Sequence, residues 1–248
     1  MREILGRRRM TRSSLRNAAL TCATQWQWPV LPGAALTSRD PETEEKREVP
    51  VGEAPMGPPG EPGDGEAELD GACACGDPDC VVPGAHPLDP ALLAATTDAR
   101  MVRWWWTNRP SAPLILATGG RAPCALSLPA VAGVRALAEF DRSGVRVGPV
   151  AATTTRFTLL VEPYRMEELG ELLYAHDWVP SSLRFHGGGG YVVLPPSATG
   201  AGQVRWERRP VAERGAGGAP WLPRMETLLD GLVEASAATP DTGSTLAY

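Results

Sequence analysis

Lysine is almost absent from this chain, since Lys46 is the only lysine among 24 basic residues. Arginine keeps its charge and binds phosphate through a planar fork, so this usage suits contact with nucleic acid, although a GC-rich genome would give the same bias. Cysteine is also scarce, and three of the five cysteines fall within eight residues, which argues against a disulfide framework. No apolar run approaches the length of a membrane span, and the N-terminus lacks the apolar core of a signal peptide. We therefore predict a soluble cytoplasmic protein with no membrane contact.

The net charge of −5 hides two segments of opposite sign. Residues 37–70 hold eleven acidic residues against three basic ones, a local balance of −8, so the rest of the chain carries +3. Six arginines face one glutamate in the first sixteen residues. The sequence therefore separates a basic N-terminal arm from an acidic segment.

The 25 prolines and 27 glycines cluster in particular segments, and PMGPPGEPGDGE lies within the acidic one. Such a segment has too little apolar surface to offset the entropy of ordering, so we predict that it is disordered. With 248 residues, 43% of them hydrophobic, the remainder suffices for one large or two small domains. We predict a basic arm (1–14), a single domain (15–36 and 71–238) interrupted by a disordered insertion (37–70), and a flexible tail (239–248).

Hydrophobic periodicity predicts interleaved helices and strands, which indicates an α+β or α/β domain. Helices are expected over 14–26, 99–108, 130–141, from 166 to 173 and from 225 to 233. Their expected core residues include Met101, Val131, Val134, Ala138 and Met166. The expected strands are WPVLPG, PLILATGG, APCALSL, GPVAATT, FTLLVEP, LRFH, YVVL and QVRWERR. No internal repeat is visible.

The segment CACGDPDCVVPGAHP carries a candidate metal site formed by Cys73, Cys75, Cys80 and His86. Three thiolates and one imidazole suit tetrahedral zinc, and neighbouring glycines and prolines let the chain turn tightly around an ion. A closed set of four protein ligands leaves no position for substrate, so we predict a structural zinc. Incidental cysteines in a solvated loop are the alternative. Cys22 and Cys124 lie on apolar faces, where we expect buried, inert thiols.

Three consecutive tryptophans, Trp104 to Trp106, cannot share one face of a helix because successive residues are separated by 100°. We expect Trp105 and Trp106 to face the core and Trp104 to be partly exposed beside Arg100. An exposed tryptophan next to arginine could stack on a nucleic-acid base, but a core residue at the edge of an element is the commoner case.

Four glycines, Gly187 to Gly190, separate two strand-like runs in LRFHGGGGYVVLPPS, beside Arg184 and His186. Together with LTCATQWQWPVLP, CACGDPDCVVPGAHP and ATTDARMVRWWWTNRPSAPLILATG, this segment resembles the N-terminal domain of bifunctional DNA primase/polymerases (Prim-Pol). The resemblance covers most of residues 15–210 outside the acidic insertion. It implies an RRM-like mixed sheet, a zinc-bearing loop and two-metal nucleotidyl transfer in DNA replication.

The acidic positions of the family do not match this chain. Members carry Asp-x-Asp or Asp-x-Glu after the ATG segment, where this chain reads Ser127-Leu128-Pro129. The family's histidine would fall near Arg156 or Phe157, and its third acid near Arg184. The resemblance therefore leaves the two divalent ions without carboxylate ligands.

Arginine at position 184 would convert a metal pocket into an anion pocket, with His186 and the backbone amides of Gly188, Gly189 and Gly190 nearby. A drifted hairpin turn is the alternative reading of this segment. Trp104 is a further candidate for nucleic-acid binding.

Three hypotheses remain open for the function. In the first, the domain has lost catalysis but still binds single-stranded DNA or a nucleotide. In the second, it is an active primase/polymerase that uses Mg²⁺ or Mn²⁺ held by other acids, for example Glu139, Asp141 or Glu162. In the third, it is a scaffold for a replication or regulatory protein.

Overall fold

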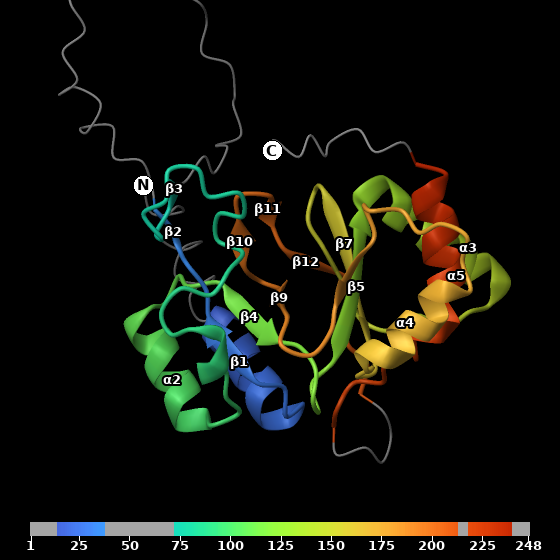
Figure 1. Cartoon of the computed structure of the whole chain (residues 1–248). Coiled ribbons are helices and arrows are strands. Elements are labelled where there is room, and N and C mark those ends of the chain that lie inside the picture. Colours follow the sequence, from blue (N-terminus) through green and yellow to red (C-terminus); the bar gives the residue numbers. More distant parts are fainter. Residues whose placement is uncertain (1–13, 38–71, 213–217, 240–248) are drawn as a thin grey trace, which may run out of the picture.

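The computed structural model describes residues 14–37, 72–212 and 218–239. Residues 1–13 of the basic arm, nearly all of the acidic insertion and most of the tail lie outside these ranges. Within them the chain forms two lobes, each built on its own sheet (Figure 1). The predicted α+β class is confirmed. Among the described residues, no helix is both long and apolar enough to cross a lipid bilayer.

The larger lobe contains a five-stranded sheet in the order β12-β6-β7-β5-β8. Its strands are β5 (Cys124–Pro129), β6 (Val150–Ala152), β7 (Arg156–Val161), β8 (Arg184–His186) and β12 (Arg205–Arg208). With the helices α3 (Ala130–Ser143) and α4 (Met166–Tyr174), strands β5 to β8 follow the βαββαβ succession of an RRM-like fold. Every ladder is antiparallel, so the prediction of a mixed sheet is wrong. The reason is that each helix joins strands that are not neighbours in the sheet.

The helices α3, α4 and α5 (Met225–Ala237) cover one face of this sheet and bury the larger core with it (Figure 1). On α3, small residues lie against the sheet, because a Cβ on Gly133 would come within 2.5 Å of the Phe157 ring. The helix therefore buries Ala132 and Ala136 and leaves Val131 and Val134 about 60% and 59% exposed, contrary to the prediction. The other face of the sheet is free of these helices.

The smaller lobe contains a three-stranded antiparallel sheet in the order β1-β4-β9. Its strands are β1 (Val30–Pro32), β4 (Leu114–Ala117) and β9 (Tyr191–Leu194). Residues 14–20 are helical and continue into the π-helical turn η1 (Thr21–Gln25). These elements and α2 (Ala99–Asn108) enclose a second core around Trp106, whose indole N–H donates to the Ala112 carbonyl.

The start of α2 is fixed by an N-cap, since the Asp98 side chain accepts from the backbone N–H groups of Arg100 and Met101. Trp105 and Trp106 are buried as predicted, and Trp104 is 57% exposed. Met101 on α2 and Met166 on α4 are exposed, so their predicted core positions are wrong. Both lie in the first turns of their helices, outside the faces that pack.

Several short elements lie outside the two main sheets. They are β2 (Leu36–Thr37), β3 (Ala72–Cys73), the 3₁₀ turn η3 (Leu92–Ala94), β10 (Ala198–Thr199) and β11 (Gly202–Gln203). β2 pairs with β3, so Thr37 lies opposite Ala72 although the acidic insertion separates them in sequence. The β2–β3 pair also carries Cys73.

Candidate functional site

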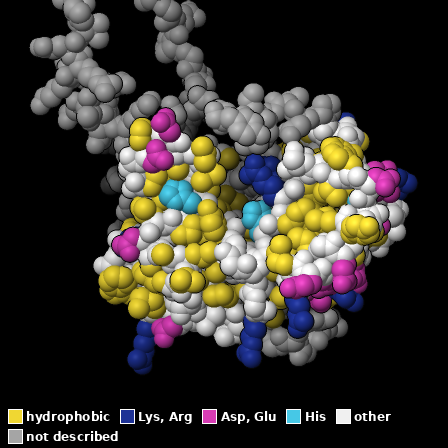
Figure 2. Space-filling view, viewed as in Figure 1, with side chains coloured by type: hydrophobic (Ala, Val, Ile, Leu, Met, Phe, Trp, Pro, Cys, Tyr) yellow, Lys and Arg dark blue, Asp and Glu magenta, His cyan; other side chains and the backbone are white. Residues whose placement is uncertain are grey.

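A cavity of about 850 Å³ lies between the two lobes, against the face of the five-stranded sheet that the helices leave open. Figure 2 shows a hollow in this region, where basic and histidine side chains meet, while acidic side chains lie toward the edges of the view. The volume falls in the range of typical small-molecule sites. We call this space the interlobe cavity.

Strand alternation places alternate side chains of the sheet in this cavity. Ser127 on β5 lies opposite Thr158 on β7 and Arg184 on β8, so these side chains share the open face. Two residues along their strands, Arg156 and His186 join them, and all five line the cavity. The register of β5 with β7 and β8 therefore brings together residues that are far apart in the sequence.

Ser127 is the centre of a hydrogen-bonded group. Its Oγ lies 2.9 Å from His186 Nε2 and 3.2 Å from an Arg156 guanidinium nitrogen. The same nitrogen donates to the carbonyls of Ser127 at 2.8 Å and Ser182 at 2.9 Å. Arg156 therefore links β5 to the segment that leads into β8, and its positive charge lies next to Ser127.

Burial lowers the pKa of His186 to about 4, and the positive charges of Arg156 and Arg184 act in the same direction. The imidazole is therefore neutral near pH 7. It contributes a hydrogen-bonding group rather than a charge, and the positive potential of this wall comes from the two arginines.

No acidic side chain is found among the described residues that line the interlobe cavity. The opposite wall is mainly apolar and includes Val81, Val82, Pro83 and Val193. The cavity thus has a cationic side and an apolar side. A site of this kind suits a ligand with one anionic end and one apolar end.

The four glycines connect the lobes, because β8 belongs to the five-stranded sheet and β9 to the three-stranded sheet. The Gly189 and Gly190 amides donate to the carbonyls of Thr118 and Gly187, so these two N–H groups are engaged within the protein. A Cβ on Gly119 would come within 2.3 Å of the Gly188 Cα. Close packing therefore requires glycine at position 119 and favours it at position 190, where a Cβ would lie 2.9 Å from Thr118 Oγ1, whereas a Cβ on Gly188 would meet no atom within 4 Å. Because the Gly189 and Gly190 amides are engaged, they are not the cavity's donors to an anion.

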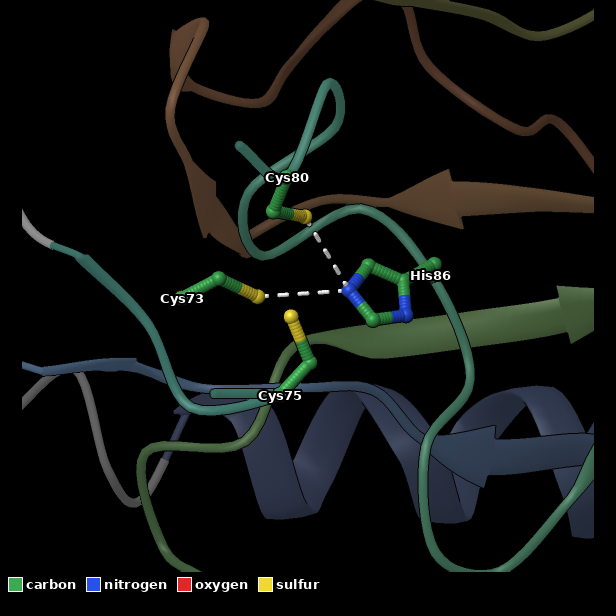
Figure 3. Close-up of side chains that lie close together, drawn as sticks. All are labelled: Cys73, Cys75, Cys80 and His86. Carbon is green, nitrogen blue, oxygen red and sulfur yellow. Dashed lines mark hydrogen bonds between the residues drawn. The ribbon is translucent and has the colours of Figure 1, made fainter. Parts of the chain in front are cut away.

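The metal-binding prediction rests on four residues that the structure brings together (Figure 3). The ligand atoms of Cys73, Cys75, Cys80 and His86 all lie within 4.8 Å of one another. Tetrahedral zinc with bonds of about 2.3 Å needs sulfur atoms roughly 3.8 Å apart, so the spacing fits. These residues could hold a metal ion, and the donor set is the one that zinc prefers.

Hydrogen bonds around the cluster also suit a metal. His86 Nδ1 lies 2.8 Å from the Pro87 carbonyl, an arrangement that aims Nε2 at the three sulfurs. Burial would raise the pKa of the Cys73 thiol, but the backbone of Gly84 and Cys75 and the His86 ring lower it to about 6. A thiolate is the form that binds zinc.

The cysteine loop, residues 73–86, also forms part of the cavity wall. Val81, Val82, Pro83 and Ala85 lie between the last two candidate ligands, Cys80 and His86, and line the cavity. The Gly200 amide donates to the Pro83 carbonyl at 2.8 Å, which joins the loop to the turn after β10. The metal site and the cavity are therefore adjacent.

Four predicted positions do not line the cavity, and one of them is Gly188, which lies in the crossing from β8 to β9. Phe157 is 3% exposed and faces the helices, as strand alternation requires beside Arg156. Pro129 ends β5 opposite Arg156 but does not line the cavity, and Trp104 lies on α2 away from it. Sequence reasoning missed Arg156 and Thr158 as cavity residues. Their alternation with buried Phe157 and Leu159 is the signal that could have revealed them.

The fold and the site define a class: an RRM-like sheet whose open face borders a cavity walled by a Cys₃His loop. The family model described as "Bifunctional DNA primase/polymerase, N-terminal" matches residues 19–220. The chain therefore belongs to the Prim-Pol family. No curated protein and no solved structure matches it significantly.

Proposed function

We propose that this Prim-Pol domain binds a nucleotide or single-stranded nucleic acid in the interlobe cavity but does not transfer nucleotides. The observation that carries the proposal is the composition of the cavity wall. Arg156, Arg184 and His186 line it, and no acidic side chain does so among the described residues. Family membership supports a nucleic-acid ligand, and the wall chemistry supports the loss of catalysis.

Two-metal nucleotidyl transfer needs several carboxylates to hold two ions about 4 Å apart. Ser127 supplies a hydroxyl at the first acidic position of the family, and Pro129 supplies no side-chain ligand at the second. Arg184 lies directly opposite Ser127, so its positive charge would repel a divalent ion there. The residues present therefore do not fit the family's metal pair.

The other acidic residues considered do not replace the missing carboxylate ligands. Glu139 and Asp141 lie on α3 and form ion pairs with Arg142 and Arg208. Helix α3 covers the opposite face of the sheet from the cavity. Glu162 follows the end of β7 and is not part of the cavity lining. An active enzyme with substitute acids is therefore the weaker hypothesis.

Zinc has a structural role in this proposal, with Cys73, Cys75, Cys80 and His86 as ligands. All five cysteines are free thiols, which suits the predicted reducing, cytoplasmic compartment. Binding of a replication or regulatory protein remains the scaffold hypothesis.

A template-dependent incorporation assay with Mg²⁺ and with Mn²⁺, together with binding of single-stranded DNA at increasing salt, tests the proposal. We expect no primer synthesis or extension, and weak binding that falls steeply with salt because neutralised phosphates release counterions. Robust incorporation by the wild-type protein would overturn the loss of catalysis. Absence of both incorporation and binding of DNA or nucleotides would favour the scaffold hypothesis.

A further inference from the structure

We propose that Arg184 binds a phosphate group of the ligand directly, in place of a divalent cation, and that the apolar wall of the cysteine loop receives the nucleoside end. This inference rests on the proposed function and deepens it. It assigns a ligand class, a nucleoside phosphate, and an orientation for that ligand within the interlobe cavity.

Arg184 is suited to this role because its charge is available. Its side chain is exposed at the cavity, and no carboxylate of the described chain lies within 4.0 Å of its guanidinium. A guanidinium binds phosphate through two parallel hydrogen bonds and needs no metal to do so. The register opposite Ser127 places it on the face where the family holds its ions.

Arg156 has a different task. Its guanidinium donates to the carbonyls of Ser127 and Ser182 and to the Ser127 hydroxyl. These contacts fix its position inside the wall, so its charge adds to the potential while Arg184 makes the contact. Neutral His186 lies 2.9 Å from Ser127 Oγ and adds no charge to this wall, so the contact with the phosphate falls to Arg184.

The opposite wall of the cavity indicates which chemical group lies at the other end of the ligand. Val81, Val82 and Pro83 present aliphatic surface, and Tyr191 lies at the same cavity. A nucleobase is flat and largely apolar on its faces, so it suits this wall better than the arginines do. An inorganic phosphate would leave the apolar wall uncovered, and we therefore expect a nucleoside to improve affinity.

A divalent cation has no carboxylate ligand among the described residues that line the cavity, and it would compete with Arg184 for the phosphate. Binding should therefore occur without Mg²⁺, and added Mg²⁺ should leave affinity unchanged or weaken it. This expectation separates the site from a metal-dependent nucleotide site, where Mg²⁺ is required.

Calorimetric titration of the full-length, metal-loaded chain tests this with four probes: inorganic phosphate, deoxyadenosine, dAMP and a short oligothymidylate. Each is titrated with and without Mg²⁺, in metal-free buffer that contains no chelator, so that the cysteine loop keeps its ion. We expect dAMP to bind more tightly than phosphate or deoxyadenosine. If the oligonucleotide binds more tightly than dAMP, the phosphate belongs to a nucleic-acid strand. If the two bind equally, the ligand is a free nucleotide.

Arg184→Glu should weaken dAMP binding about tenfold or more, and Arg184→Lys should weaken it less, because lysine keeps the charge but loses the fork. Arg142→Glu makes the same charge change on α3 and should leave affinity within about twofold. Thermal melts of each variant exclude a folding defect. Binding that requires Mg²⁺, or survives Arg184→Glu, would overturn this inference alone. Failure of the wild-type protein to bind either dAMP or the oligonucleotide would overturn the proposed function as well.

Discussion

Ser127 shows at the residue scale how a substitution can be accommodated by its neighbours. Its hydroxyl lies 2.9 Å from His186 Nε2, and its backbone carbonyl accepts from Arg156. A carboxylate here would face two arginines, whereas the neutral hydroxyl leaves the charge of Arg184 available to a ligand. In our proposal, Ser127 and its hydrogen-bonded neighbours therefore form part of the wall of a binding site rather than the remains of a metal site.

His186 gives a pH prediction at the same scale. Its pKa is lowered from 6.5 to about 4 by burial, and by Arg156 and Arg184. Between these values the unfolded chain binds a proton that the folded chain does not, so the free energy of unfolding falls as the pH drops from 6.5 to 4. Above pH 6.5 this contribution is constant. We expect a loss of about 1–3 kcal/mol from this group.

Urea denaturation at pH 7, 6, 5 and 4 measures this contribution. His186→Asn removes the titrating ring, so the variant should lose less stability than the wild type over this interval. His176→Asn, at a side chain that contacts Asp230 instead, is the matched control and should follow the wild type more closely. Parallel pH profiles for wild type and His186→Asn would contradict the prediction.

At the element scale, the cysteine loop links a metal site to a cavity wall. Val81 to Pro83 follow Cys80 directly and line the interlobe cavity, so their positions depend on a ligand of the proposed zinc. Metal binding stabilises such loops because the ordered ligand set is absent from the unfolded chain. We therefore expect metal binding and cavity structure to be coupled.

Cys80→Ser tests this coupling. Purified wild-type protein should contain about one zinc per chain, and the variant should lose it and melt at least about 5 °C lower. Its affinity for dAMP should also fall. Asp79→Asn changes the preceding, exposed residue without touching a ligand and should keep the metal. Elemental analysis that finds no metal in untagged wild-type protein would reject the site.

The elements also show what the sequence could predict. Most helices and strands follow from periodicity, and the closing helix, expected from 225 to 233, buries Met225, Leu228, Leu229, Leu232 and Val233. The buried face of α3 could not be predicted in this way. Periodicity assigns the valines to the core, whereas in the structure Gly133 makes the close approach to Phe157. The distance between α3 and the sheet determines which face of the helix packs, and this distance cannot be read from composition.

The cavity likewise was only partly predictable. Arg184 and His186 could be proposed from the segment that carries them, and the cysteine cluster from its ligand types. The contact of Arg156 with Ser127 depends on the register of β5 with β7, which the sequence alone does not specify. The Gly189 amide donates to the Thr118 carbonyl, a contact that depends on a second chain crossing.

At the scale of the whole molecule, two neighbouring crossings join the lobes: residues 118–123 lead from β4 to β5, and residues 187–190 lead from β8 to β9. Thr118 connects the crossings, because its hydroxyl donates to the Gly187 carbonyl at 2.6 Å and its amide to the Gly190 carbonyl. The interlobe cavity is bounded by both lobes, so these contacts help to set its width. The glycine run thus supports the site through packing.

The acidic insertion gives the last prediction. Its ends are neighbours, since Thr37 pairs with Ala72 on the β2–β3 ladder. Replacing residues 38–71 with a short Gly/Ser linker should keep this pair and the adjacent Cys73 in place. Loop-closure entropy changes only slowly with length, so the free energy of unfolding should rise by about 1 kcal/mol or remain unchanged. Denaturation and zinc content of the shortened chain measure the effect, with a scrambled insertion of equal length as control. A clear fall in stability on shortening, but not on scrambling, would show that the length of the segment matters. A fall on both would show that its particular sequence packs against the domain.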